Sequence, residues 1–456
     1  MITSVDPWTG EKLRGFREYS GQEINEALDA AVTAQSKWRF VRLEERLGLL
    51  RNLASVLREN KKDLAGLITL EMGKPITESE AEIEKCAYNC DHYAEAAPRY
   101  LAAEFIESTA TASAVEFEPL GVVLAIMPWN YPFWQLFRFA APAFAAGNGI
   151  ILKHANNVPQ CALSIEKVFS KAGTPSGLFK TLLIDNAHVA SLISDDRIAA
   201  VTLTGSTQVG ALVAAQAGQA LKKQVLELGG SDPFIVLADA DIGTAAKAAV
   251  KARFTNVGQS CVNAKRFIVD RGVADRFVDA FVDEARKLKV GDPRDPDTNI
   301  GPMARADLRQ SLHDQVQRTV SAGGVVRLGG QEVEGPGFTY EPTIIDNVHP
   351  SMVAFCEETF GPVAAVIRSS STDESIRLAN QTEFGLAASI WTSDVATARQ
   401  LSRRIDAGAV FINDVVMSDP RLPFGGIKKS GYGRELGSYG IREFTNIKTL
   451  WIGPAT

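Results

Sequence analysis

The feature that most constrains this fold is a series of short apolar runs that begins at Gly121 and alternates with helix-like segments. Nearly every position in these runs is apolar, which is typical of parallel strands buried on both faces. Strands separated by helices favour right-handed crossovers. The runs are GVVLAIM, GIILK, LFKTLLI, IAAVTLTG and KKQVLELGG, followed by PFIVL, RFIVD, PVAAVI, AASIW and AVFIN. We therefore expect an α/β protein with two doubly wound parallel domains in tandem.

The rest of the chain indicates helices and a small β arm. A capping box begins at Ser20, and apolar residues at helical spacing follow it. Further helices are predicted over 43–70 and 78–97. Two segments, 109–118 and 444–452, are rich in strand-forming residues and have no evident partner in either α/β domain. Bare strand edges invite aggregation, so we expect these segments to pair between subunits of a homodimer or homotetramer.

Charge and hydropathy exclude several classes of partner. The 48 Lys and Arg residues against 54 Asp and Glu residues give a net charge of −6, without a long basic block. Nucleic acid and anionic membranes are therefore poor partners. The longest apolar stretch, Gly121 to Met127, is far shorter than the ~20 residues of a membrane helix. The first residues lack the features of a signal peptide, which predicts a soluble, cytoplasmic protein.

The cysteines do not form a disulfide framework, because there are only five and they are widely scattered: Cys86, Cys90, Cys161, Cys261 and Cys356. Cys86, Cys90 and His92 are close in sequence, but no second cluster completes a tetrahedral site, so we expect no metal. Cys261 lies among polar and small residues in GQSC, just before the strand RFIVD. That position suits a nucleophile. Taken alone, however, it fits a structural cysteine better, because no His lies nearby in sequence.

Polar and glycine-rich segments follow four of the predicted strands, where a doubly wound sheet binds its ligands. These segments are 128–132, 153–156, 205–210 and 227–230. Residues 205–210 form a glycine-bracketed turn into a helix, whose free N–H groups and dipole favour a phosphate. Thr207 stands where the usual dinucleotide fingerprint has its middle glycine, so this turn alone is weak evidence.

Five motifs in one order resemble the aldehyde dehydrogenase superfamily. They are PWN at 128–130, ELGG at 227–230, GQSC at 258–261, EETFGP at 357–362 and PFGG at 423–426. The resemblance extends over essentially the whole chain, from the Asp6 region to Ile452. It implies an NAD(P)-binding domain over 1–102 and 121–229, a catalytic domain over 230–430, and bridging segments for oligomerisation over 103–120 and 431–456.

The resemblance also implies an NAD(P)-dependent, non-acylating aldehyde dehydrogenase. Cys261 would attack the aldehyde carbonyl as a thiolate. The side-chain amide of Asn130 and the backbone N–H of Cys261 would stabilise the oxyanion. Glu227 would act as general base on the water that hydrolyses the thioester. A CoA-acylating enzyme would not need Glu227, and a structural protein of this fold would be expected to lose Cys261 or the cofactor loops.

The cofactor residues are likewise implied by the resemblance. They are Trp129 along the pyrophosphate channel, Gly205 and Ser206 at the phosphates, Lys153 at the adenosine ribose, Glu358 at the nicotinamide ribose, and Phe360 on the nicotinamide side, with Leu228 as a further cofactor residue. Phe360 could equally be a core aromatic. Many NAD-preferring relatives carry a glutamate where this chain has Asn156. A neutral residue beside Lys153 removes the repulsion of a 2′-phosphate, so we expect both NADP and NAD to be used.

Two residues suggest the aldehyde. Arg138 is the only charged residue in an apolar helix after the Asn130 loop, and Ser418 lies in the loop before PFGG. A guanidinium and a hydroxyl at a tunnel mouth suit a carboxylate. With the KHAN segment, these residues resemble the bacterial succinate semialdehyde dehydrogenase branch. In the alternatives, Arg138 pairs with a structural acid, or aromatic residues such as Phe424 bind another semialdehyde or a neutral aliphatic or aromatic aldehyde.

Overall fold

The first large sheet has six strands in the order β17-β9-β8-β5-β6-β7 in the computed structural model, which describes residues 1–454. All neighbouring strands are parallel except β17 and β9. The strands are β5 (Val122–Met127), β6 (Gly149–His154), β7 (Phe179–Thr181), β8 (Ile198–Thr204), β9 (Lys223–Glu227) and β17 (Gly431–Tyr432).

The apolar run of β5 is explained by its two buried faces. Val123, Ala125 and Met127 belong to one hydrophobic core, and Val122 and Leu124 belong to another. Alternate side chains of a strand point to opposite faces, so a strand covered on both sides needs apolar residues throughout. The first core contains residues of α2 (Leu43–Glu59), α3 (Lys61–Met72), α4 (Ile76–Tyr100), α5 (Trp134–Ala146), α6 (Pro159–Lys171) and α15 (Gly437–Glu443). The second contains residues of α1 (Gly21–Trp38), α7 (Val189–Ser194) and α8 (Thr207–Gln219).

The helix ends differ in part from those predicted. The capping box at the start of α1 is confirmed, with Ser20 and Glu23 bonded reciprocally. The single helix predicted over 43–70 is wrong, because the chain divides it at Asn60. The Asn60 side chain donates to the carbonyl of Val56, a local bond that competes with a continuous helix.

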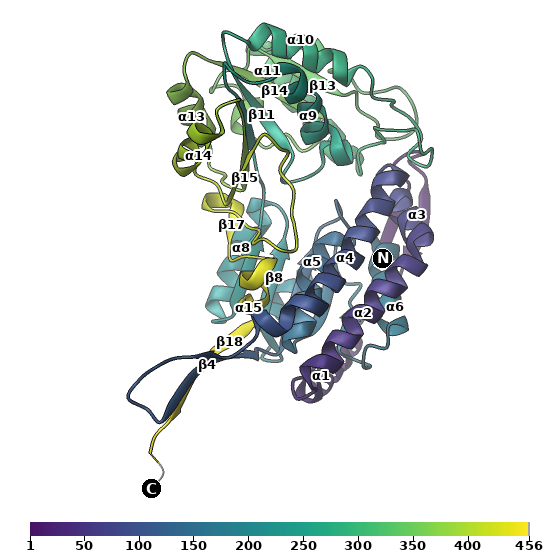
Figure 1. Ribbon diagram of the computed structural model, residues 1–456. Helices are drawn as coiled ribbons and strands as arrows, with labels where there is room; N and C mark the ends of the chain where they lie inside the picture. The colour runs from purple at the N-terminus through teal and green to yellow at the C-terminus, as the bar shows by residue number, and fades with distance from the viewer. Residues whose placement is uncertain (455–456) are drawn as a thin grey trace.

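The second large sheet has seven strands in the order β12-β13-β14-β11-β10-β15-β16, and only β12 and β13 are antiparallel. The strands are β10 (Asp232–Val236), β11 (Ala264–Asp270), β12 (Val325–Leu328), β13 (Thr343–Asp346), β14 (Val363–Ser369), β15 (Ala387–Trp391) and β16 (Ala409–Ile412). Around them lie α9 (Ile242–Phe254), α10 (Ala274–Ala285), α11 (Ala306–Ser321), α12 (Val353–Cys356), α13 (Thr372–Asn380) and α14 (Val395–Leu401) (Figure 1). The two predicted parallel α/β units are therefore confirmed.

The domain boundaries stay a prediction, with one difference at the C-terminal end. Residues 431–432 form β17, which pairs with β9 of the first sheet rather than with the bridging segment. A short hairpin at the N-terminus consists of β1 (Ile2–Val5) and β2 (Lys12–Phe16). Within residues 1–454, none of the helices combines the length and apolar character needed to cross a membrane.

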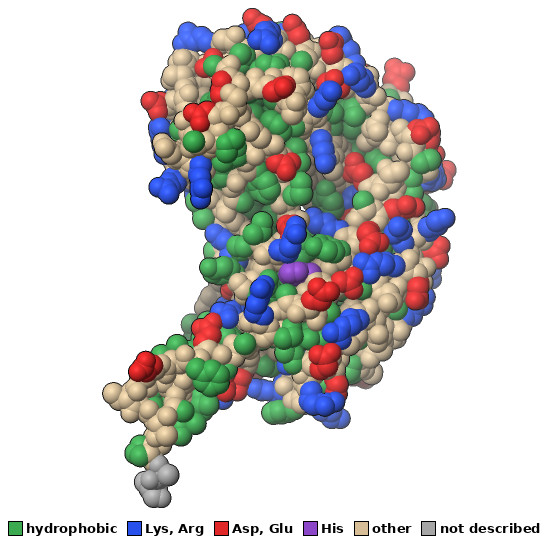
Figure 2. Space-filling model, in the orientation of Figure 1, with side chains coloured by type: hydrophobic (Ala, Val, Ile, Leu, Met, Phe, Trp, Pro, Cys, Tyr) green, Lys and Arg blue, Asp and Glu red, His purple; other side chains and the backbone are tan. Residues whose placement is uncertain are grey.

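A three-stranded arm projects from the body of the molecule (Figure 1). It contains β3 (Glu104–Phe105), β4 (Ala112–Pro119) and β18 (Thr445–Ile452). The segments 109–118 and 444–452, expected to pair between subunits, instead pair with each other within one chain, antiparallel from Thr445 opposite Pro119 to Ile452 opposite Ala112. Hydrophobic side chains gather on this arm (Figure 2), and Phe105 and Trp451 are 84% and 56% exposed.

Candidate active site

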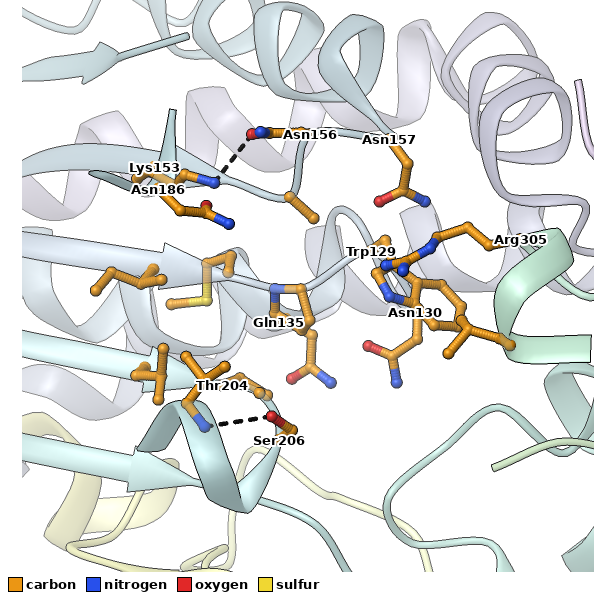
Figure 3. Close-up of a pocket in the computed structure, with 18 of the residues that line it drawn as sticks. Trp129, Asn130, Gln135, Lys153, Asn156, Asn157, Asn186, Thr204, Ser206 and Arg305 are labelled. Atoms are coloured by element: carbon orange, nitrogen blue, oxygen red, sulfur yellow. Dashed lines mark hydrogen bonds between the residues drawn. The ribbon is translucent and has the colours of Figure 1, made fainter. Parts of the chain in front are cut away.

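A cavity of about 880 Å³ lies beyond the carboxyl ends of β5, β6, β8 and β9 (Figure 3). Its lining includes all eight residues expected at the cofactor: Trp129, Lys153, Asn156, Gly205, Ser206, Leu228, Glu358 and Phe360. Cys261 and Asn130 line the same cavity. Glu227, Arg138 and Ser418 lie outside this lining. The fold thus brings the expected nucleophile and oxyanion donor into one space with the expected cofactor residues.

Several lining residues were missed by sequence reasoning. Asn157, Asp185 and Asn186 also follow strands of this sheet, so their position at strand ends was a usable signal. Met1, Thr3 and Glu18 come from the N-terminal hairpin region, and Arg305 comes from the start of α11. Nothing in the sequence indicates that those segments reach the cavity, because the hairpin is placed by long-range contacts with Leu183 and Arg305 belongs to the second half of the chain.

One end of the cavity is suited to a ribose and its phosphate. The Nζ of Lys153 donates to Oδ1 of Asn156 at 3.0 Å (Figure 3). Burial lowers the pKa of Lys153 to about 8, while Asp185 opposes that shift. A bound anion would stabilise the charged form of this ammonium. The neighbouring Asn157 has a buried Nδ2 without a hydrogen-bond partner, which leaves a second donor available to a ligand.

The N-terminus of α8 supplies a phosphate site. The side chain of Ser206 caps the helix by accepting from the backbone N–H of Val209 at 3.3 Å (Figure 3). The remaining free N–H groups and the positive end of the helix dipole face the cavity beside Gly205. Gly210 gives this helix close contact with Leu228, since an added Cβ would lie 2.4 Å from Cδ2 of that residue.

The opposite end of the cavity brings aromatic rings and a carboxylate together. Trp129 and Phe360 meet edge to face, with their ring centroids 5.8 Å apart. Oε1 of Glu358 accepts from the backbone N–H of Gly230 at 3.1 Å and pairs with Nζ of Lys265 at 3.3 Å. These two contacts fix the carboxylate at the cavity wall, where it can accept hydrogen bonds from ribose hydroxyls.

The loop that carries Cys261 is held by an amide network. Asn256, Val257 and Gly258 all have positive φ angles, which is costly for the first two residues and requires support from the surroundings. Nδ2 of Asn256 donates to the carbonyl oxygens of Asn130 at 2.8 Å and Gln259 at 3.1 Å.

Asn130 is anchored by the same network. Its Nδ2 donates to the carbonyl of Gln259 at 3.0 Å, which occupies one of its two N–H groups. The second N–H remains for a substrate oxygen. Figure 3 shows the Asn130 side chain among those that surround the cavity.

The thiol of Cys261 is half-buried among opposing charges. Burial raises its pKa to about 11, whereas the charges of Arg138 and Lys265 act to lower it. Lys265 is fully buried and donates to the carbonyl of Cys261 at 2.9 Å. Two cations therefore favour the thiolate at a position where burial disfavours it.

Glu227 is a buried carboxyl group with neither oxygen hydrogen-bonded. Burial raises its pKa well above the usual value, and Arg138 partly opposes this shift. Glu227 also raises the pKa of Cys261, so the two groups interact. A Cβ on Gly425 would lie 2.7 Å from Oε1 of Glu227, so the PFGG motif leaves room for this carboxyl group. An unpartnered acid with a raised pKa is suited to general-base chemistry near neutral pH.

The structure does not bring Arg138 and Ser418 into direct contact. Arg138 is only 2% exposed and forms an ion pair with the equally buried Glu435, which sequence reasoning did not identify. Glu435 is therefore the structural acid that the sequence analysis allowed as an alternative partner of Arg138. The guanidinium also lies 4.7 Å from the ring centroid of Phe424. Ser418 instead accepts a hydrogen bond from Nζ of Lys85 at 2.8 Å.

Comparison with known proteins agrees with this arrangement. Residues 1–450 match the aldehyde dehydrogenase family. The chain belongs to that family. The NAD(P)+ succinate semialdehyde dehydrogenase Sad of Escherichia coli is 49% identical over 448 residues, which cover 98% of this chain and 97% of that protein. An NADP+ succinate-semialdehyde dehydrogenase of Mycobacterium tuberculosis is 46% identical and covers 99% of both chains.

Solved structures of the aldehyde dehydrogenase family confirm the fold. The succinic semialdehyde dehydrogenase of Streptococcus pyogenes, solved in complex with NADP+, superposes with a TM-score of 0.97 at 37% identity. The match covers the whole of both chains. The predicted family, fold class and type of enzyme are therefore confirmed.

Proposed function

We propose that this aldehyde dehydrogenase oxidises succinate semialdehyde to succinate, with NADP or NAD as hydride acceptor. One observation carries the proposal: Cys261 and Asn130 line the same cavity as all eight expected cofactor residues. The names of the similar enzymes support the substrate, and so does a cationic Arg138 that interacts with both Cys261 and Glu227.

In the first half-reaction Cys261 attacks the aldehyde carbon as a thiolate, and the carbonyl oxygen becomes an oxyanion. The free N–H of the Asn130 amide and the backbone N–H of Cys261 donate to it. Arg138 and Lys265 favour the thiolate by their charge. The nicotinamide of a bound cofactor would accept the hydride that leaves the adduct, and a thioester would remain on Cys261.

In the second half-reaction Glu227 removes a proton from water, which attacks the thioester carbonyl and releases the acid. The absence of hydrogen bonds to the Glu227 oxygens leaves both of them free to accept that proton. The raised pKa makes Glu227 a stronger base than an exposed carboxylate. A CoA-acylating reaction would need no such group.

The cavity lining fits a dinucleotide, and position 156 at its adenosine end carries a neutral side chain. Lys153 and Asn156 would contact the ribose, and Gly205 and Ser206 the phosphates. Glu358 would contact the nicotinamide ribose. The side chains that would lie beside the bound dinucleotide are Trp129, Phe360 and Leu228. Because Asn156 is neutral and bonded to Lys153, a 2′-phosphate meets the Lys153 cation and no carboxylate at position 156; the nearest carboxylate that acts on Lys153 is Asp185. NADP and NAD are therefore both accepted.

The substrate carboxylate would bind near Arg138 and Ser418. The ion pair of Nε with Glu435 and the hydrogen bond from Nη2 to Oγ1 of Thr204 at 3.4 Å hold the guanidinium in one orientation, and the N–H groups of Nη1 would bind the substrate. Phe424 lies against the same guanidinium and supplies an apolar wall for the short carbon chain. A general aliphatic or aromatic aldehyde is the second candidate, because Phe424 and Trp134 would suit it too.

The enzyme is proposed to act as a homodimer or homotetramer in the cytoplasm. The exposed apolar residues of β18 and β3 support subunit contact, because both strands are edges of the arm. All five cysteines are free, which is usual for a reducing compartment. A monomer measured by light scattering at micromolar concentration would overturn the oligomer.

The function is tested by the rise in absorbance at 340 nm with succinate semialdehyde, glutarate semialdehyde, butanal and benzaldehyde, each with NADP and NAD. We expect the highest kcat/KM for succinate semialdehyde, without any requirement for CoA. Equal kcat/KM values for succinate semialdehyde and butanal would overturn the substrate, and a strict CoA requirement would overturn the reaction type.

A further inference from the structure

Lys85, on α4, has its cation beside the proposed substrate region but takes no part in the chemistry described so far. Its Nζ donates to Oγ of Ser418 at 2.8 Å, across 333 positions of sequence. The same ammonium lies 4.3 Å from the ring centroid of Trp134, which fixes its direction by a cation–π contact. Both Lys85 and Ser418 are partly exposed, so this cluster lies where solvent reaches it.

The helix α5 connects this cluster to the reacting thiol. Trp134 and Arg138 are four residues apart and therefore lie on one face of α5. The charge of Arg138 lowers the pKa of both Cys261 and Lys85, so Arg138 is close enough to interact with each of them. Lys85 and Ser418 are partly exposed, whereas Trp134 and Arg138 are buried.

Lys85 has no acid of its own within residues 1–454. The acids close enough to affect it are Glu82 and Asp419, and both are already engaged. Glu82 pairs with Lys74 and accepts from the backbone N–H groups at the start of α5. Asp419 is held by two hydrogen bonds from the side chain of Arg421. The ammonium is therefore fixed in position by Ser418 and Trp134 and remains available to an external anion.

We propose that Lys85 is a specificity-determining residue, which binds the substrate carboxylate together with the hydroxyl of Ser418. This inference rests on the proposed function and extends it, because the substrate carboxylate then contacts both Lys85 and Arg138 rather than Arg138 alone. Arg138 shares its charge with Glu435, whereas Lys85 shares its charge with no acid. A substrate carboxylate between Lys85 and Arg138 neutralises Lys85, which is the cation that the protein leaves unpaired.

This role implies a pH dependence of substrate selection. Burial and, after it, the neighbouring charge of Arg138 lower the pKa of Lys85 to about 8, while Cys86, Glu82 and Asp419 act in the opposite direction. Above that pH the ammonium loses its proton and its attraction for a carboxylate. The kcat/KM for succinate semialdehyde should then fall relative to that for butanal, which needs no cation.

The test compares Lys85→Met, which keeps the length and apolar contact with Trp134, with Lys85→Arg, which keeps the charge. The control is Lys62→Met, an exposed lysine on α3. At pH 7 we expect Lys85→Met to raise KM for succinate semialdehyde at least about tenfold, with kcat and the constants for butanal nearly unchanged. Lys85→Arg should retain most of the affinity and remove the decline above pH 8.

Three results would overturn the inference in different ways. If wild type prefers succinate semialdehyde and Lys85→Met keeps that preference, Lys85 is structural and the proposed function stands. If wild type oxidises butanal as well as succinate semialdehyde, the proposed function fails and the inference fails with it. Equal loss on both substrates in Lys85→Met, with a lowered unfolding temperature, would also show a structural role.

Discussion

The buried pair of Arg138 and Glu435 offers a test that separates stability from substrate binding. Each residue is 2% exposed. The Glu435 oxygens contact no hydrogen-bond donor beyond the guanidinium, so Arg138→Ala leaves a buried acid without a partner. Removing one member of such a pair typically costs about 3–5 kcal/mol. Arg138→Met combined with Glu435→Gln removes both charges and should cost much less.

The loss of stability in Arg138→Ala should depend on pH. Burial raises the pKa of Glu435 already in the wild type, and Arg138 opposes this shift. Without Arg138 the folded-state pKa rises further above the unfolded-state value. The protonated acid is then tolerated at low pH, and stability falls as pH rises through the folded-state pKa. The destabilisation should therefore be larger at pH 8 than at pH 5.

The assay is thermal unfolding of wild type, the single variant and the double variant at pH 5 and pH 8. The double variant is also the cleaner test of the substrate role, because it should fold. We expect it to raise KM for succinate semialdehyde at least about tenfold and to leave KM for butanal nearly unchanged. Equal unfolding temperatures for the single and double variants at pH 8 would refute the argument for a costly unpaired acid.

Three further predictions follow from the site. Cys261→Ala should abolish formation of reduced cofactor while NADP still quenches tryptophan fluorescence with wild-type affinity, and loss of NADP binding would contradict the assignment. Asn130→Ala should lower kcat by about 10²–10³ if its amide is one of two oxyanion donors, and a loss confined to KM would contradict it. Asn156→Glu should raise KM for NADP at least about tenfold and spare NAD, since a carboxylate beside Lys153 repels only the 2′-phosphate. Equal effects on NADP and NAD would show that position 156 does not face the 2′ group.

Much of the fold could be predicted because the pattern that defines it is local. The run at β5 is apolar on both alternating faces, and each face packs in a separate core. The polar segments after β5, β6, β8 and β9 then meet at one sheet edge, which places Asn130, Lys153 and Ser206 around one cavity. Parallel strands make this convergence a consequence of topology.

The parts that could not be predicted depend on contacts between distant segments. Glu435 pairs with Arg138 across almost 300 positions, and Ser418 bonds Lys85 across 333. An apolar helix with one arginine indicates that an anion is required. The sequence pattern does not indicate whether the protein or the substrate supplies that anion. The division of 43–70 at Asn60 has a different reason, because it accompanies a local side-chain bond to Val56 that periodicity does not detect.

Glu227 gives the clearest test of the second half-reaction. Glu227→Gln keeps the shape of the side chain but cannot accept a proton, so acylation of Cys261 should proceed and hydrolysis should not. We expect a burst of reduced cofactor of about one equivalent per active site, followed by a stall, in a stopped-flow trace at 340 nm.

The pH profile tests the same assignment independently. Burial holds the pKa of Glu227 well above its usual value, and only the ionised form removes a proton from water. In wild type the steady-state kcat should therefore rise with pH as Glu227 ionises. The burst amplitude of Glu227→Gln should lack that rise, because no step before the stall uses residue 227. Cys86→Ser, a buried change on α4 away from the cavity, serves as the control and should keep the wild-type profile. Full steady-state turnover in Glu227→Gln would remove Glu227 from the mechanism and leave deacylation to another base.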